Sequence, residues 1–323
     1  MQACPTRHYD RRAGKALPAI PVALIVAVGA VDGQRLALPR AFLRAEETDP
    51  NEAALQRRAL QQAVTQAQPD EALVTDRGFP LSRLHAVGAK AYVVRGPKNF
   101  SARRAQLPAY TGRGRKPTRG LLVRPLPRQR QGKTLPATLP DCTVTWCEGA
   151  LTLRAEFWYD LVRPKASAPP SPFLVSVIHD PRFAEPLLLA TPLPLSGAAL
   201  RDLYLDRWPV EQLPLAAKQM IGAERQFVFA PESRQRLPEL SLLAGNVLSY
   251  VAATHEAIPT GYWDRNPQRT PGRARRVLAR ADFSKDLALP NRLREKHSAT
   301  AHLPKGIMAN RRGTEVSRQA RVT

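Results

Sequence analysis

The chain is short of cysteine and of aromatic residues. Its 323 residues include three cysteines, without a CxxC pair or a histidine at the spacing of a zinc site. Because so few thiols are typical of a protein in the reducing cytoplasm, we expect neither a disulfide framework nor a zinc centre. Aromatic residues make up 6% of the chain and gather in one β-like stretch, which disfavours a surface of interleaved aromatics for stacking on RNA bases.

Long apolar runs are also missing. No stretch reaches the roughly 18 uninterrupted apolar residues of a membrane-spanning helix. The apolar run 16–31 follows two arginines, like a signal peptide, but two prolines interrupt it and it continues through a turn at 31–34 into a second apolar stretch, 36–43. This pattern predicts a β-hairpin, and we expect a cytoplasmic protein with no export signal and no membrane partner.

Acidic residues are most clearly absent from residues 95–140, which carry 12 Lys and Arg and no Asp or Glu. Residues 264–323 carry 15 basic against 5 acidic residues, and these two basic segments account for the whole net charge of +22. Each bound phosphate needs a cation, so the segments predict a nucleic-acid partner. An anionic membrane is a weaker alternative, and two solvated loops are the purely structural one.

Apolar periodicity predicts an α/β layout after the hairpin. We expect an amphipathic helix over 51–68, a short buried strand over 72–75, a helix over 81–87 and a strand over 91–94. Asp76 follows the 72–75 strand directly. We expect this strand to be central and Asp76 to lie at its carboxyl end, where open α/β sheets carry their chemistry.

The second half of the chain interrupts this layout and then resumes it. Alternation over 143–162 predicts a β-rich insertion, and apolar strands over 173–178 and 187–191 come before helical regions over 196–222 and 237–257. The fold class is therefore α/β, a mixed sheet flanked by helices. We expect an irregular N-terminal segment at 1–21, a first part of the core at 22–97, a basic loop with the β insertion at 98–170, a second part of the core at 171–258, and a basic, partly disordered tail at 259–323.

Four residues of the second half share a helical spacing. Tyr204, Arg207, Glu211 and Lys218 stand at relative positions 0, 3, 7 and 14. Two and four helical turns are about 7 and 14 residues, so we expect all four on one face of a helix. A carboxylate, two cations and a phenol on one face suit the joint binding of a metal ion and phosphates. A helix with unrelated charged side chains is the alternative.

The pattern Tyr-x2-Arg-x3-Glu-x6-Lys resembles the YREK signature of insertion-sequence transposases of the insertion sequence four type, which have a DDE active site. Residues 76–79, Asp-Arg-Gly-Phe, are similar to the motif of that family in which a catalytic Asp ends a strand. The resemblance covers about residues 22–257. It implies a ribonuclease H-like core with a β insertion between the Asp and the Glu, and here 134 residues separate Asp76 from Glu211.

The resemblance implies metal-dependent DNA cleavage and strand transfer at the inverted repeats of a transposon. Asp76 and Glu211 would bind Mg²⁺ (or Mn²⁺) as two of three carboxylates that hold two ions about 4 Å apart. The implied partner is double-stranded DNA at the nucleoid, with a DNA-induced homodimer. Charged groups suit phosphate binding; the residues expected on DNA phosphates are Tyr204, Arg207, Lys218, Arg113, Arg115 and Lys116.

Two features depart from the family. Only two strands are expected before the first helix, whereas the first Asp of the family stands in the first of three; Asp10 is a weak candidate for this ligand, and Asp32 a weaker one. With no N-terminal helical DNA-binding region either, we expect a transposase that lost its N-terminus or whose start was assigned late.

The second departure lies in the signature helix. Pro214, between Glu211 and Lys218, predicts a kink that takes Lys218 off the shared face. We therefore expect impaired catalysis.

Three functions stay open on the sequence alone: an active transposase, an inactive DNA-binding remnant of one, and a basic structural or RNA-associated protein. Mg²⁺-dependent nicking separates the first from the second, and a preference for duplex DNA over RNA separates both from the third. We expect Trp146 and Trp208 to be packing residues.

Overall fold

The computed structural model describes most of the chain and divides it into two compact units, Met1–Ala274 and Arg275–Thr323. In the second unit, two short antiparallel strands are described, β15 (Ile307–Ala309) and β16 (Val316–Arg318). The described residues are 6–10, 14–19, 21–46, 49, 51–112, 114–164, 172–222, 231–279, 307–309 and 316–318.

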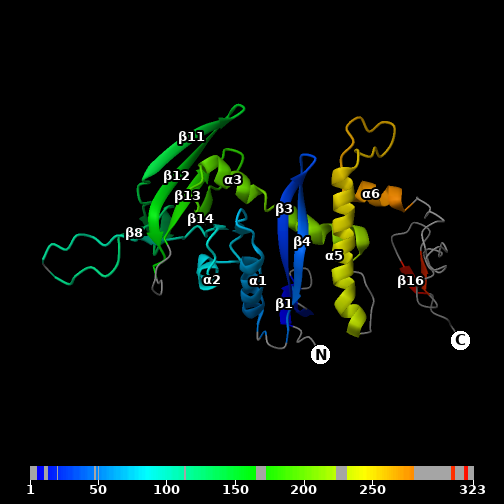
Figure 1. Cartoon of the computed structure of the whole chain (residues 1–323), viewed down its shortest axis with the longest axis horizontal. Coiled ribbons are helices and arrows are strands. Elements are labelled where there is room, and N and C mark those ends of the chain that lie inside the picture. The colour runs from blue at the N-terminus through cyan, green and yellow to red at the C-terminus, as the bar shows by residue number, and fades with distance from the viewer. Residues whose placement is uncertain are drawn as a thin grey trace. The chain divides into compact units, whose positions relative to one another are not determined.

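The first unit is a mixed α/β fold built on one eight-stranded sheet (Figure 1). β5 and β6 run parallel, and every other pairing in the sheet is antiparallel. The strands of the expected insertion and of the expected core therefore share one sheet, because β13 and β14 join β12 to β6. The strand order is β5 (Leu73–Thr75), β6 (Tyr92–Arg95), β14 (Leu187–Thr191), β13 (Phe173–His179), β12 (Leu151–Val162), β7 (Ala102–Arg104) and β8 (Leu122–Val123), with β11 (Cys142–Glu148) also paired to β12.

Helices cover both faces of this sheet, because apolar side chains point alternately to the two sides of each strand. On one face, Val175 and Val177 of β13 pack with residues of α1 (Glu52–Gln66) and α2 (Leu81–Ala86). On the other face, Ile178 packs with α3 (Gly197–Leu205). The prediction of a mixed sheet flanked by helices is confirmed at this level.

Strand β12 changes phase near its end. Leu153, Ala155 and Phe157 are buried, as the alternation predicts, but the register shifts between Trp158 and Leu161 and Trp158 is fully buried. Asp160, within this bulge, has a φ of 50°. Trp158 is buried on the face opposite to Phe157, because helices cover both faces of the sheet. The bulge adds one residue, which places Leu161 on the same side as Trp158 and not on that of Phe157.

The predicted hairpin forms from β3 (Val22–Val31) and β4 (Gln34–Arg44). Its turn residues Asp32 and Gly33 have φ values of 48° and 72°, and two left-handed residues are what a two-residue hairpin turn of type I′ requires. The hairpin is a sheet of its own and packs on α1 through Leu43.

The segment expected to be irregular holds two more strands, β1 (Thr6–Asp10) and β2 (Lys15–Ala19), which pair antiparallel. Four strands therefore precede α1, and the expectation of only two is wrong. A similar short hairpin lies in the first basic segment, β9 (Arg128–Arg130) with β10 (Lys133–Leu135).

The helical region after α3 contains four further elements. They are α4 (Pro209–Ala216), a π-helical turn η1 (Ala217–Ile221), α5 (Pro231–Thr254) and α6 (Pro271–Leu278). In Figure 1, α5 runs beside the β3–β4 hairpin. No helix among the described residues is long and apolar enough to cross a bilayer.

Candidate functional site

The four signature residues lie on three successive helical elements and one turn. Tyr204 is in the last turn of α3, Arg207 in the turn at 206–208, Glu211 in the first turn of α4, and Lys218 in η1. The expectation that all four residues lie on a single helix is therefore wrong. Pro209 explains the break, because proline is favoured at the first position of a helix and α4 begins there.

Three of the four side chains contact one another. The guanidinium carbon of Arg207 lies 5.7 Å from the ring centre of Tyr204, which is buried, and Arg207 Nη2 donates to Glu211 Oε1 at 2.7 Å. Burial is the largest single effect on the pKa of Arg207 and lowers it, but the hydrogen bond to Glu211 and the interactions with Glu211 and Tyr204 together outweigh burial, so the pKa is raised. Arg207 therefore stays fully charged between an aromatic face and a carboxylate.

Lys218 is separated from this cluster by a change of helix type. It is exposed and lies within η1, where hydrogen bonds span five residues and one turn takes more residues than in an α-helix. Pro214, inside α4, has no backbone N–H to give to the carbonyl of Val210. The spacing of 14 residues thus does not bring Lys218 to the face of Glu211 by the regular helical repeat.

Asp76 directly follows the last residue of β5, as predicted, and is exposed. Its Oδ1 accepts a hydrogen bond from the backbone N–H of Gly78 at 2.8 Å. A Cβ on Gly78 would come within 3.0 Å of that oxygen, so a small residue suits this position. Among the described residues, β5 stands at the end of the strand order and pairs only with β6, so the expectation of a central strand is wrong for this part of the chain.

Asp76 and the start of α4 line one cleft of about 730 Å³. Arg207, Val210 and Pro214 contribute from the signature segment, and β3, β5 and α1 supply most of the remaining wall. A smaller cleft of about 250 Å³ shares Arg207 and Val210 with it. Arg207 is thus the signature residue that borders the same space as Asp76, from which it is 131 positions distant in the sequence. Tyr204, Glu211 and Lys218 do not line either cleft.

Two strands in the wall of this cleft lack a second partner. Within the described part of the chain, β3 pairs only with β4 and β5 pairs only with β6. Backbone N–H and C=O groups along these two edges are therefore open to another strand.

Ion pairs hold the rim of the smaller cleft. Arg40 pairs with Glu71, and Arg35 Nε lies 2.6 Å from Asp206 Oδ1. Both arginines come from β4, so the hairpin is tied to the loop before β5 and to the turn after α3. These pairs also occupy two carboxylates, Glu71 and Asp206, that line the smaller cleft together with Arg207.

The described residues offer fewer clustered donors for metal ions than the resemblance implies. Among the described residues, no group of three or more His, Cys, Asp or Glu side chains has a metal-binding arrangement. One oxygen of Asp76 accepts a hydrogen bond from the backbone N–H of Gly78, and Glu211 accepts one from Arg207. Asp10 ends β1, but its side chain lies outside the described residues. Two carboxylates do not fit the three-carboxylate, two-ion arrangement.

The first basic segment presents charge that is not neutralised locally. Some of its cations are paired, as Lys98 is with Glu185 and Arg104 with Asp141. Arg113 lies outside the described residues. In the described part of the chain, five exposed cations of this segment form no ion pair with a carboxylate: Arg115, Lys116, Arg119, Arg130 and Lys133.

Both tryptophans named in the sequence analysis were expected to be packing residues, and only one of them is. Trp146 is half-buried against the core on the α3 side, as expected. Trp208 is 59% exposed, so its assignment as a packing residue is wrong. Sequence reasoning also missed Tyr262 and Trp263, which are 97% and 72% exposed. The available signal was two adjacent aromatics in a segment of Gly, Pro, Asn and Arg.

The chain matches no protein-family model and no curated protein sequence. The assignment of function therefore depends on the residues and the geometry described above.

Proposed function

We propose that this chain is a DNA-binding protein with a ribonuclease H-like core related to the DDE transposases, impaired in DNA cleavage and strand transfer. The observation that carries the proposal is the shared cleft. Asp76 at the end of β5 and the Arg207–Val210–Pro214 side of the signature segment border one space, although they lie far apart in the sequence. Convergence of two motifs on one cleft is expected of a functional site more than of unrelated surface residues.

The open strand edges support the ribonuclease H-like part of the proposal. The resemblance implies three antiparallel strands ahead of α1, and β3 and β4 supply two of them. The cleft shared by β3 and β5 is bordered by strands with no second partner among the described residues. A third strand there would join the hairpin to the eight-stranded sheet.

Impaired cleavage follows from the carboxylates. Phosphoryl transfer by such a site needs carboxylates that are free to bind two cations, and here Glu211 is neutralised by Arg207 while the third carboxylate is missing from the described set. Arg207 itself is suited to a phosphate, because a guanidinium binds phosphate oxygens through two N–H groups. The described residues therefore suit the binding of a DNA phosphate at this face better than they suit DNA cleavage.

The test compares binding with cleavage in the full chain. We expect tight, salt-sensitive binding to a random-sequence DNA duplex of about 30 base pairs and weaker binding to an RNA duplex of equal length, measured by fluorescence anisotropy. With supercoiled plasmid and Mg²⁺ or Mn²⁺, we expect no nicking above that of the Asp76→Asn, Glu211→Gln variant.

Three outcomes would change the conclusion. A preference for the RNA duplex would favour a basic RNA-associated protein. Nicking that the Asp76→Asn, Glu211→Gln variant lacks would make the chain an active nuclease or transposase. Failure to bind either duplex would overturn the proposal as a whole.

A further inference from the structure

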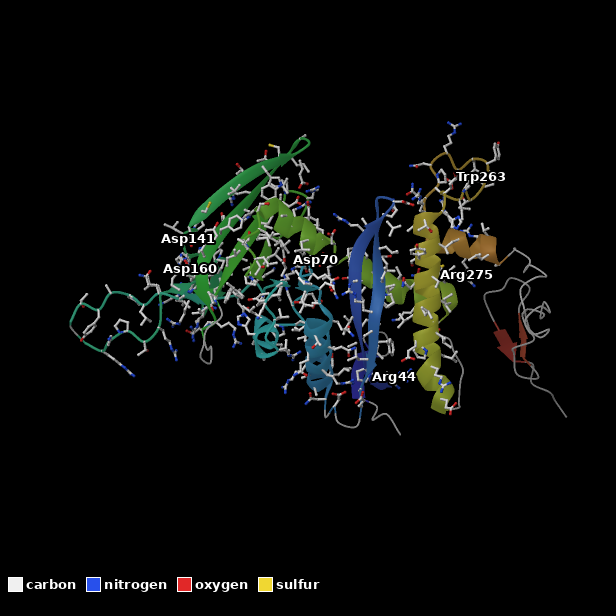
Figure 2. The ribbon with its side chains drawn as sticks, viewed as in Figure 1. Arg44, Asp70, Asp141, Asp160, Trp263 and Arg275 are labelled. Carbon is white, nitrogen blue, oxygen red and sulfur yellow. The ribbon has the colours of Figure 1, made fainter. Side chains whose placement is uncertain are left out.

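The most exposed aromatic side chains of the described residues lie next to each other in the loop between α5 and α6. Tyr262 and Trp263 pack edge to face, with ring centres 5.7 Å apart and planes at 77°. Figure 2 labels Trp263 on this loop, beyond the end of α5. Burying two such rings against the protein would stabilise the fold, so their exposure needs another explanation.

The loop holds the pair in place. Asp264 Oδ2 accepts from the backbone N–H and the hydroxyl of Thr260, both at 3.0 Å, and the N–H of Asp264 donates to Gly261 O at 3.0 Å. The Trp263 ring lies over Gly261, where a Cβ would come within 2.8 Å of a ring carbon. The turn is therefore closed on itself, with the two rings on its outside.

Arginines fasten the turn to the body of the first unit. Arg273 Nη1 lies 3.0 Å from Asp264 Oδ2 and 2.8 Å from Ile258 O, and Arg269 Nη1 donates to Ala253 O at 2.9 Å. Ala253 belongs to α5. A preorganised aromatic pair loses little conformational entropy on binding, which favours a recognition role over an accidental exposure.

The surrounding charge indicates the kind of partner. The loop opens the second basic segment, and exposed Arg265, next to Asp264, forms no ion pair among the described residues. Flat aromatic faces beside cations are the combination that binds unpaired nucleobases, because the rings stack on bases while the cations contact the adjoining phosphates. A paired base inside a duplex offers no free face for such stacking.

From this geometry we propose that Tyr262 and Trp263 form a base-stacking site for unpaired DNA bases, an aromatic tip on the 255–270 loop. The proposal rests on the proposed DNA binding and extends it from duplex DNA to DNA with unstacked bases. In this proposal the aromatic tip selects DNA that has unpaired bases, and it is a different site from the cleft that Asp76 lines.

The experiment uses the full chain and the Tyr262→Ala, Trp263→Ala variant. Binding is measured by anisotropy on a fully paired duplex and on the same duplex with three unpaired thymines. We expect wild type to prefer the second probe, and the variant to lose about 5- to 150-fold on it per stacked base while its affinity for the paired duplex changes less than twofold. The Tyr262→Phe, Trp263→Phe variant should keep the preference, because its rings still stack.

Phe183→Ala is the matched control, since Phe183 is also an exposed loop aromatic but lies outside the two basic segments. Equal losses in the control, or an undiminished preference in the double alanine variant, would overturn the base-stacking site while leaving duplex binding intact. Wild type that binds neither probe would overturn the proposed function and this site with it. Loss of binding to vesicles containing phosphatidylserine, with DNA preference unchanged, would assign the tip to a membrane surface and overturn the proposal.

Discussion

Arg201 and Arg207 stand six residues apart near the end of α3 and hold their charges in different ways. Arg201 has a side chain only 8% exposed and contacts three carboxylates, Asp180, Glu148 and Asp202. Arg207 contacts one carboxylate and an aromatic ring. A guanidinium that contacts three carboxylates stabilises the fold by linking the elements that carry them. A guanidinium with one carboxylate partner still has N–H groups available to bind another anion.

The ion pairs of Asp180 with Arg201 and Arg182 make the stability of the fold sensitive to low pH. Hydrogen bonds from Arg182 lower the pKa of Asp180 to about 2, and Arg201 adds a further bond. Because the folded pKa is below the unfolded one, this stabilisation is present above pH 4 and is lost as the pH falls towards 2. We expect Asp180→Asn to reduce the free energy of unfolding by about 2–4 kcal/mol at pH 7, measured by urea denaturation.

Asp202→Asn is the control for that measurement. Asp202 contacts the same guanidinium but its side chain is 56% exposed, so its loss should cost less than about 1 kcal/mol. The difference in the free energy of unfolding between wild type and the Asp180 variant should narrow as the pH falls from 4 towards 2. Equal costs for the two variants, or a gap that does not depend on pH, would contradict the assignment.

At the scale of elements, local patterns predicted what local interactions determine. Asp32 and Gly33 between two apolar runs predicted the hairpin, and alternation predicted β12 up to its bulge. The sequence did not predict that the core and insertion strands form one sheet. One reason is that β7 pairs with the end of β12 although more than fifty residues separate them. Periodicity gives the faces of a strand and contains no information on its distant neighbour.

The signature segment shows the same limit. The spacing of Tyr204, Arg207 and Glu211 predicted their proximity, and the structure brings them together. Pro214 indicated a disturbance, but not that it would take the form of η1. That turn is packed against α5, where a Cβ on Gly245 would lie 2.8 Å from the backbone nitrogen of Ala217.

This contact predicts an unusual effect of a helix-favouring substitution. Glycine to alanine inside a helix ordinarily stabilises a protein, by about 0.4–1 kcal/mol. We expect Gly245→Ala to destabilise this one by about 1–3 kcal/mol, because the methyl group pushes α5 away from η1. Thermal or urea unfolding measures the change.

Ser249→Ala, one turn further along α5, is the matched substitution. Its hydroxyl donates to Gly245 O at 2.9 Å, and its removal adds no atom to the helix interface. We expect a change within about 0.5 kcal/mol. Stabilisation by Gly245→Ala would show that α5 does not press on η1.

For the whole molecule, the positive charge is separated from the acids that would neutralise it. Outside the two basic segments the chain is neutral as a set, and arginines such as Arg58 and Arg182 are matched with carboxylates. In the first basic segment several exposed cations have no such match within the described residues. The charge excess is thus concentrated where a polyanion can reach it.

Salt dependence tests this distribution. Each phosphate contact contributes about 0.9 to the slope of log affinity against log salt concentration. We expect Arg115→Ala with Lys116→Ala to reduce that slope by about 2 on a 30-base-pair duplex between 50 and 200 mM salt.

Lys98→Ala is the control, because Lys98 is paired with Glu185 and contributes little free charge. Its slope should match that of wild type. Identical slopes for all three proteins would mean that DNA does not contact the first basic segment at these residues.

The base of the β9–β10 hairpin has a practical consequence. Thr138 N donates to Arg124 O at 2.7 Å, and Arg124 N donates to Thr138 Oγ1 at 2.9 Å. These two hydrogen bonds hold together the chain segments that enter and leave the β9–β10 hairpin. Residues 129–134, all exposed, are therefore the place where we expect an unrelated hairpin or a fluorescent reporter to be accepted, whereas Leu126 packs against the core and has to stay. The protein offers, at this stem, a grafting position inside its own basic segment.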